Sequence, residues 1–465
     1  MTTPAQPPAD TGVPASAPAA LAGQETSPGS PPPSAPGEAG EAGEAGEAGA
    51  GGSASLWRDR QFRRFWSAQS VSEFGDRVSE LALPLIAVTL LNASPSQVGF
   101  LTAAVWLPNL ASLFIGTWVD QHRDKRPLMI AADLVRTVLL LSLPVAYWLD
   151  ILSLGQLYAI AILAGTAHVV FNTAYASFFV RLVKREQYLE ANSKLASTRS
   201  ISFIAGPAVG GLLIQWLTAP IALLVDALSF LFSAFQVSRL KVEPGAADDG
   251  EESLLTRARA GMKYLLKHPY LRASLGCATT VNFFNMIGMA LLVLFASRNL
   301  GLSAGTIGVA FGVGASGGLV GALAANRLAR LIGAGRLIAL GSVVFPASLG
   351  IVALAGGPVW MRAATVAAAE FVGGFAVMCF DVPLNSLQAS VTHDHMRSRV
   401  AGAFSSINYG VRPLGAVIGG LLGTWLGVRE TLLISAAGGL LAVLWLLPSP
   451  IIRTRDLDGL EPPAM

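Results

Sequence analysis

The sequence predicts an all-α integral membrane protein with twelve transmembrane helices in two pseudo-symmetric bundles of six. Of its 465 residues, 52% are hydrophobic and only 13% are charged, and the mean hydropathy is +0.55. A soluble globular chain carries about 25% charged residues. Between Phe62 and Leu447 the chain divides into twelve apolar stretches, most of them near the roughly 20 residues that a helix needs to cross a bilayer.

These stretches predict helices because a chain in hydrocarbon must satisfy its own backbone polar groups, and the stretches are too long and continuous for barrel strands. The predicted spans are residues 66 to 91, 97 to 119, 127 to 149, 154 to 179, 196 to 217, 219 to 239, 270 to 296, 305 to 325, 335 to 355, 361 to 383, 401 to 425 and 429 to 448.

Basic residues are concentrated in alternate connections between the spans, which predicts that both termini lie in the cytoplasm, since cytoplasmic loops carry an excess of Lys and Arg. The opposite connections, such as residues 92 to 96 and 149 to 153, are short and nearly free of Lys and Arg. We therefore expect a multi-pass protein of the plasma membrane. The basic clusters include Arg58, Arg60, Arg63 and Arg64; Arg123, Lys125 and Arg126; Arg181, Lys184 and Arg185; Arg327, Arg330 and Arg336; Arg397 and Arg399; and Arg453 and Arg455.

Composition also predicts the domain boundaries. Residues 1–55 are rich in Pro, Ala, Gly and Ser, which predicts a disordered cytoplasmic tail. Residues 241–269 form a polar cytoplasmic linker between six-span regions at 56–240 and 270–450, and residues 451–465 form a second cytoplasmic tail. Within the linker, apolar and basic residues alternate at helical spacing. This pattern indicates an amphipathic helix, either at the membrane surface or packed under the bundle.

The two halves resemble each other in sequence. A glycine-rich segment in span five recurs in span eleven, about 209 residues later. Six-helix halves repeated in parallel orientation are typical of transporters with a substrate site between the halves, and glycines in spans allow close helix packing. The predicted packing residues are Gly206, Pro207, Gly210, Gly211, Gly415, Gly419 and Gly420.

The segment from Gly116 to Arg126 resembles the loop signature of the major facilitator superfamily. It has a Gly-x-x-x-Asp sequence followed by basic residues, between spans two and three, where that family carries it. Further segments resemble its drug-exporter branch, which includes macrolide and enterobactin efflux proteins. They are Phe171-Asn172, Glu190-Ala191-Asn192, Gly206-Pro207 and Arg397-Ser-Arg399-Val400. The resemblance covers residues 56 to 450 and implies efflux by alternating access.

One feature departs from that branch. Many proton-coupled drug exporters carry an arginine inside span four, whereas residues 157 to 179 hold no basic side chain besides His168. The resemblance therefore implies a different route for proton coupling here.

The resemblance also implies that the loop motif gates transport. Asp120 would accept hydrogen bonds from the start of span eleven, where the helix dipole stabilises a carboxylate by about 0.3 to 1 kcal/mol. Basic residues of the loop and charged residues of span three would exchange salt bridges as the halves move. The alternative is a permanent loop clamp with positive-inside anchoring. The residues concerned are Gly116, Asp120, Arg123, Arg126, Asp133 and Arg136.

Charged residues inside spans are candidates for proton coupling, because each costs roughly 2.5 to 3.5 kcal/mol at a helix centre and must face protein or water. Span one places Glu73, Asp76, Arg77 and Glu80 on one helix face. We expect Asp76 or Glu80 to couple, while Glu73 and Arg77 are alternatively a static pair. Rival sites are Asp226, Glu370, Asp381 and Arg412, and Asp226 is alternatively a packing residue hydrogen-bonded to a neighbouring helix.

Aromatic and amide side chains in several spans are candidates for the substrate cavity, because an apolar pocket with few polar anchors suits an amphipathic organic molecule. Packing against a neighbouring helix or lipid is the alternative for each. The candidates are Trp106, Phe171, Asn282, Phe283, Phe284 and Asn285.

Other chemistry is not indicated. The segment Gly312 to Gly317 matches a dinucleotide fingerprint in spelling but lies inside a span, and His393 and His395 have no further metal ligand nearby in sequence. Cys277 and Cys379 lie in separate spans, the net charge of +3 does not suggest nucleic acid, and no ATP-binding loop is present. We expect no cofactor, no metal and no enzymatic activity.

The sequence thus predicts a proton-coupled exporter of small amphipathic compounds, such as antibiotics or siderophores, acting as a monomer in the lipid bilayer. Its expected ligands are a small-molecule substrate and protons. The alternatives are a proton-coupled importer of a small nutrient and a membrane scaffold that transports nothing.

Overall fold

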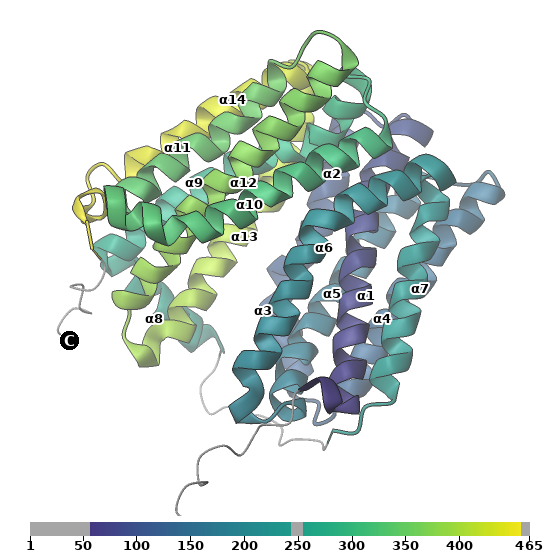
Figure 1. The fold of residues 1–465 in the computed structure, drawn as a ribbon, viewed down its shortest axis with the longest axis horizontal. Coiled ribbons are helices and arrows are strands. Elements are labelled where there is room, and N and C mark those ends of the chain that lie inside the picture. Colours follow the sequence, from purple (N-terminus) through teal and green to yellow (C-terminus); the bar gives the residue numbers. More distant parts are fainter. Residues whose placement is uncertain (1–55, 243–253, 457–465) are drawn as a thin grey trace, which may run out of the picture. The chain divides into compact units, whose positions relative to one another are not determined.

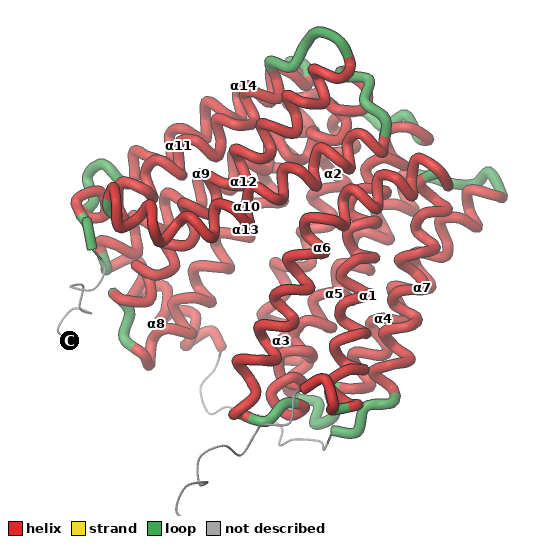
Figure 2. Tube along the Cα trace, viewed as in Figure 1, coloured by secondary structure: helices red, strands yellow, loops and turns green. Residues whose placement is uncertain are grey.

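A computed structural model describes residues 56–242 and 254–456, and these residues form helices joined by short turns (Figures 1 and 2). The first seven helices are α1 (Arg60–Leu85), α2 (Pro95–Trp106), α3 (Ser112–Asp120), α4 (Arg126–Trp148), α5 (Leu154–Leu182), α6 (Tyr188–Leu217) and α7 (Ala219–Ser238). The others are α8 (Leu254–Lys267), α9 (Pro269–Leu294), α10 (Ala304–Ile332), α11 (Ala334–Ala353), α12 (Val359–Ser390), α13 (Arg397–Trp425) and α14 (Val428–Leu440).

The described helices include the twelve predicted spans. Nine are long and apolar enough to cross a membrane, and the pair Pro95–Ala111 and Phe114–Asp120, counted as one span bent by 51° at the break between them, makes a tenth. Helices α1 and α13 are long enough, at 26 and 29 residues, but carry more charged side chains than a purely apolar span. The predicted all-helical fold class is confirmed.

Each bundle is held together by packing around its first helix and the glycines of its fifth span. In the first bundle, helix α1 packs against helices α6 and α7, and helix α4 packs against helices α5 and α7. In the second, α9 packs against α13 and α14, while α12 packs against α10 and α11. Gly206 and Gly210 contact α1, and Gly415 and Gly419 contact α9, so the repeated motif makes the same contact in each half.

The repeat extends to the irregular ends of the first helix of each bundle. Helix α1 ends in a π-helical turn, Ile86–Leu90, and α9 ends in another, Phe295–Asn299, about 209 residues later. After each turn a serine, Ser94 or Ser303, caps the next helix by accepting a hydrogen bond from a backbone N–H. The two halves therefore share backbone detail as well as helix order.

The two bundles meet where α2 and α10 begin and α6 and α13 end, which we name the closed end. A Cβ atom on Gly99 would lie 2.6 Å from the Gly420 Cα, and one on Gly211 would lie 2.8 Å from the Gly308 Cα. Only glycine allows this approach of helix to helix. Gly308 follows Gly99 by 209 residues, and Gly420 follows Gly211 by the same number. The two glycine contacts at the closed end are therefore equivalent under the sequence repeat.

One arginine adds directed bonds to the closed end. Arg298, in the π-helical turn after α9, donates to the backbone carbonyls of Val88 at 2.6 Å and Ala93 at 2.8 Å, across the two bundles. Carbonyls at a helix end lack partners within the helix. Separation of the bundles would break the hydrogen bonds from Arg298 to these carbonyls. The two hydrogen bonds therefore oppose opening of the closed end.

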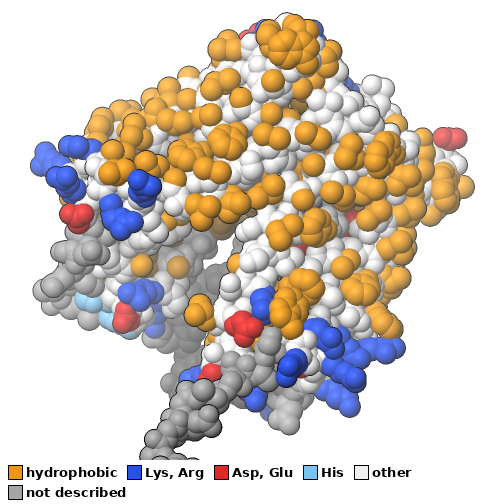
Figure 3. All heavy atoms as spheres, in the orientation of Figure 1, with side chains coloured by type: hydrophobic (Ala, Val, Ile, Leu, Met, Phe, Trp, Pro, Cys, Tyr) orange, Lys and Arg blue, Asp and Glu red, His pale blue; other side chains and the backbone are white. Residues whose placement is uncertain are grey.

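Apolar side chains cover the flanks of the helices, and basic side chains gather at the bundle ends away from the closed end (Figure 3). Large side chains such as Phe114, Trp216 and Leu323 are more than 70% exposed, at 73%, 74% and 76%. Such exposure in water would be unusual for a monomer but suits contact with lipid.

The linker contains α8, which packs against the start of α13. Leu265 is fully buried with Leu271 and Val400, and a Cβ atom on Gly261 would lie 2.2 Å from the Arg399 carbonyl oxygen. These contacts favour the packed arrangement of the predicted amphipathic helix. The tails predicted at residues 1–55 and 451–465 and the remainder of the linker lie wholly or largely outside the described residues.

Gly211→Val should separate the bundles at the closed end, because its side chain would overlap the α10 backbone. Spin labels placed at Asp150, in the α4–α5 loop of the first bundle, and at Gly356, in the α11–α12 loop of the second, should show a longer distance in double electron–electron resonance. Gly402→Val is the matched control, since a Cβ atom there has no neighbour within 4 Å. An unchanged distance in Gly211→Val would contradict the assigned contact.

Candidate functional site

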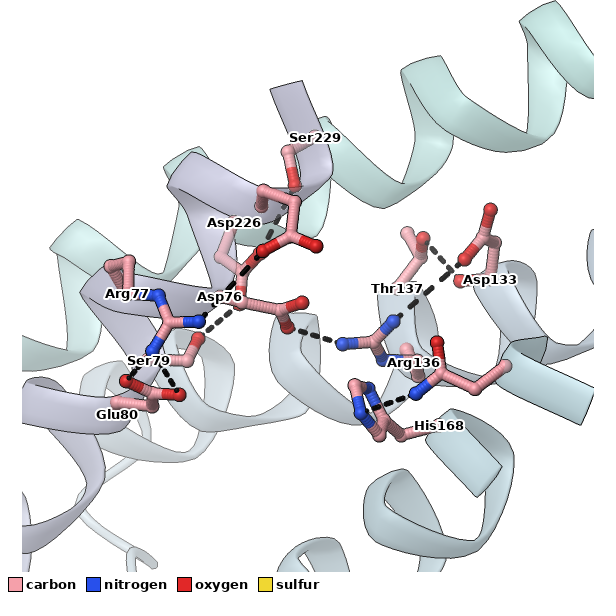
Figure 4. A network of polar contacts seen from close by, with 12 residues as sticks. Asp76, Arg77, Ser79, Glu80, Asp133, Arg136, Thr137, His168, Asp226 and Ser229 are labelled. Carbon is pink, nitrogen blue, oxygen red and sulfur yellow. Dashed lines mark hydrogen bonds and ion pairs between the residues drawn. The ribbon is translucent and has the colours of Figure 1, made fainter. Parts of the chain in front are cut away.

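A buried group of charged residues lies between α1, α4 and α7 (Figure 4). Helix α1 contributes Asp76, α4 contributes Asp133 and Arg136, and α7 contributes Asp226. We name these four residues the carboxylate cluster. Spacing of three residues places Asp133 and Arg136 on one face of α4, which the sequence already indicates.

Arg136 is the centre of the cluster. Its Nη2 donates to Asp76 Oδ1, and its Nη1 lies 3.9 Å from Asp133 Oδ1. Its guanidinium carbon lies 3.5 Å from the ring centre of Phe230. The Arg136 side chain is 6% exposed and that of Asp133 is fully buried, whereas Asp76 is 25% exposed. Asp76 is thus the accessible end of an otherwise buried ion-pair network.

Asp226 connects α7 to α1. It is fully buried and accepts hydrogen bonds from Ser79 of α1 and, at 3.0 Å, from Ser229 of its own helix. Gly75 leaves room for it, because a Cβ atom there would lie 2.3 Å from Asp226 Oδ1. The geometry matches the packing alternative for Asp226.

The other charges of α1 face α6. Arg77 lies 2.7 Å from Glu80 Oε2 and 3.8 Å from Glu73 Oε2. Glu73 also accepts a hydrogen bond from Arg199 Nε of α6 at 3.3 Å. The sequence places these four charges on one helix face, and the structure divides them: Asp76 pairs with α4, whereas Glu73, Arg77 and Glu80 form a separate network.

His168 of α5 lies beside the cluster (Figure 4). Its Nε2 is 2.7 Å from Asn172 Nδ2. The sequence marks His168 as the only basic side chain of span four, but the side that it faces depends on tertiary packing.

The substrate-cavity candidates lie in different environments. Trp106 stacks on Tyr409 with ring centres 6.3 Å apart, and Asn282 accepts hydrogen bonds from Arg412. Phe283 is half-buried and its ring contacts that of Phe284. Phe171 and Asn285 are buried in this conformation. They are 4% and 8% exposed, so neighbouring helices occupy the surface that a substrate would need.

Glu370 and Asp381, the rival carboxylates on α12, are half-buried. Glu370 packs against α10, where a Cβ atom on Gly314 would lie 2.3 Å from its Cβ. Over the described part of the chain neither carboxylate makes an ion pair. Asp76, in contrast, is paired with Arg136.

The loop motif holds its own bundle in this structure. Asp120 Oδ1 lies 3.7 Å from Lys125 Nζ, and Lys125 also donates to the Val119 carbonyl at 2.7 Å. Burial lowers the pKa of Lys125 below its ordinary value. Arg126 donates to the Leu240 carbonyl at 2.8 Å, and the Arg123 carbonyl accepts from Arg181 at 3.2 Å.

The contacts expected of this motif in transport are not those that it makes in this conformation. Among residues 56–242 and 254–456 no ion pair or hydrogen bond joins Asp120 to span eleven. Asp133 and Arg136 pair within the carboxylate cluster and not with the loop. The nearest atom to a Cβ on Gly116 would be Thr173 Cγ2, at 3.9 Å.

Comparison with known proteins identifies the family. A family model described as "Transmembrane secretion effector" matches residues 51–462. The chain belongs to this family of major facilitator superfamily transporters. The transporter is 25% identical over 394 residues to the multidrug efflux pump Tap of Mycolicibacterium fortuitum, covering 82% of this chain and 94% of the relative. It is 23% identical over 411 residues to macrolide efflux protein A of Streptococcus pyogenes, covering 86% and 97%.

Solved structures show the same fold. A bacterial homologue of the iron transporter ferroportin, in an inward-facing state, superposes with a TM-score of 0.68 at 16% identity, covering 84% of this chain and 98% of that one. The nucleoside transporter NupG superposes with a TM-score of 0.65 at 12% identity, covering 84% and 99%.

Arg136→Gln should destabilise the transporter by about 3 to 5 kcal/mol, because it leaves buried carboxylates without their cation. Adding Asp76→Asn should recover part of this loss, with a coupling energy of about 0.5 to 3 kcal/mol. Thermal unfolding in detergent measures both. Arg199→Gln, at an arginine that is 62% exposed, is the control and should cost at most about 1 kcal/mol. Strictly additive losses for the two cluster substitutions would show that the ion pair is not formed.

Proposed function

We propose that this transporter exports small amphipathic compounds in exchange for protons, with Asp76 as the proton-carrying group. The observation that supports this most is the Asp76–Arg136 ion pair, in which a 25% exposed carboxylate is bound to a 6% exposed guanidinium. A proton can reach Asp76, and its arrival changes an interaction inside the bundle.

The other carboxylates are less suited to coupling. Asp133 and Asp226 are fully buried, so a proton has no direct path to either in this conformation. Glu80 is 60% exposed and pairs with Arg77 on its own helix, so protonation of Glu80 breaks a local and largely solvated contact. Protonation of Asp76 removes a contact between α1 and α4 and leaves Asp133, at 3.9 Å, as the remaining partner of Arg136.

The two bundles supply the alternating access. If the basic ends of the bundles face the cytoplasm, as the positive-inside rule implies, the closed end faces the cell exterior. The structure then represents a state closed to the outside. Separation of the two glycine contacts at the closed end would expose the region between the bundles to the outside.

The exporter direction is favoured over the importer by two relatives named as efflux proteins, Tap and macrolide efflux protein A. One proton moving down 100 mV supplies about 2.3 kcal/mol, enough for a gradient of roughly fifty-fold in a neutral compound. Loss of ethidium from loaded cells, with and without a protonophore, tests direction and coupling together. Protonophore-sensitive accumulation of a compound would instead favour the importer.

We further propose a monomer in the plasma membrane with both termini in the cytoplasm. The bundles at 56–240 and 270–450 would be the moving parts, and the linker at 241–269 would join them on the cytoplasmic side. Packing of α8 against α13 supports a linker attached to the second bundle.

Asp76→Asn should lower gradient-driven ethidium transport in inside-out vesicles by at least about tenfold, because the variant cannot exchange a proton at this position. Ethidium counterflow, which needs no net proton movement, should persist and shows that the variant is folded. Glu80→Gln is the matched control on the same helix and should retain gradient-driven transport. Undiminished proton-dependent transport by Asp76→Asn would remove Asp76 from the mechanism.

A further inference from the structure

A second polar cluster lies between helices of the two bundles. The Arg412 guanidinium carbon of α13 lies 4.3 Å from the ring centre of Tyr409 and 4.3 Å from that of Trp106 on α2. Its Nε and Nη2 donate to Asn282 Oδ1 of α9 at 3.1 and 2.9 Å. We name Arg412, Trp106, Tyr409 and Asn282 the Arg412 cluster.

The Arg412 cluster holds a cation whose donors are only partly used. A guanidinium has five N–H donors, and both hydrogen bonds of Arg412 end on one amide oxygen. Its Nη1 has no hydrogen-bond partner within the described residues, and the side chain is half-buried. Asp381 of α12 acts on Arg412 through its charge. No ion pair joins them in the structure as described, so the guanidinium edge is free to bind an anion.

An apolar crevice of about 670 Å³ lies along the segments of α2 and α13 that carry Trp106 and Arg412, and its described lining includes sequence neighbours of the cluster residues but not the cluster residues themselves. Its lining includes Leu107, which follows Trp106, and Gly410 and Pro413, which follow Tyr409 and Arg412. The crevice is formed by α2 and α5 of the first bundle and α13 of the second. Other lining side chains are Phe100, Tyr158, Ile162 and Leu414.

We propose that the Arg412 cluster binds the carboxylate of an amphipathic cargo whose apolar body occupies this crevice. A guanidinium edge and a carboxylate match as a bidentate pair, and the aromatic rings fix the plane of the guanidinium. The volume lies within the range of small-molecule pockets. This inference rests on the proposed export function and specifies the class of compound exported.

The location also connects cargo binding to conformation. Trp106 and Leu107 belong to the first bundle, whereas Arg412 and Gly410 belong to the second. A cargo that contacts both sets binds with different affinity when the bundles separate. A ligand shifts a conformational equilibrium only through such a difference in affinity.

The probes for this site are dansyl-aminoundecanoic acid, which has a carboxylate on a long apolar chain, and its methyl ester. Fluorescence titration of the full-length transporter in detergent measures binding of both. The wild type should bind the acid at least about tenfold more tightly than the ester, and Arg412→Gln should abolish that preference. Arg362→Gln is the control, because within the described residues Arg362 of the same bundle donates its hydrogen bonds to the backbone carbonyls of Gly357 and Leu300.

A second variant tests the crevice without altering the charge. The nearest atom to a Cβ on Gly410 would be Leu110 Cδ2, at an ordinary 3.4 Å, so Gly410→Leu should fold and fill the crevice. It should weaken binding of dansyl-aminoundecanoic acid and leave binding of dansylglycine, which lacks the long chain, unchanged.

The proposed carboxylate site would be overturned if the wild type bound dansyl-aminoundecanoic acid and its methyl ester equally. It would also be overturned if Arg412→Gln still preferred the acid. That result can occur while ethidium is still exported, in which case the proposed function stands. Conversely, Arg412-dependent binding of the acid with no export of ethidium or of the acid would contradict the proposed function and leave the binding site established.

Discussion

Contact between glycine backbones at the closed end is the interaction on which the arrangement of the bundles depends. Gly99 opposes Gly420 and Gly211 opposes Gly308, so at these two points the helix backbones touch with no large side chain between them. Contacts of this kind gain dispersion energy from close approach but impose little steric obstruction to separation. Arg298 adds two directed hydrogen bonds to the same end. Such an end is suited to repeated opening and closing.

The two polar clusters are placed differently with respect to that contact. The carboxylate cluster joins α1, α4 and α7 within one bundle, whereas the Arg412 cluster joins α2 to α9 and α13 across the bundles. A proton at Asp76 would therefore act on the internal packing of the first bundle. A cargo at Arg412 would act directly on the distance between the bundles. This separation allows each ligand to bias the same conformational change without occupying the same site.

The twelve spans, the repeat and the membrane location follow from the sequence because hydrophobic length, charge placement and glycine spacing are local properties. The pairing of charged side chains with one another does not follow from the sequence. A helical projection places Asp76 and Arg77 on neighbouring positions of α1, but only packing decides that Asp76 meets Arg136 of α4 while Arg77 faces α6. Phe171 shows the same limit, because an aromatic side chain in a span packs into a core as readily as it lines a cavity. The resemblance places Asp120 beside span eleven, whereas in this structure Asp120 pairs with Lys125.

We propose that the protonation state of Asp76 controls the closed end, although the two are separate in the fold. The most direct measurement is the pH dependence of the distance between spin labels at Asp150 and Gly356, in the wild type and in Asp76→Asn. The account predicts that the population of molecules with separated bundles changes with pH in the wild type and does not change in the variant. A distance distribution that is independent of pH in the wild type, or equally dependent on pH in both proteins, would contradict it.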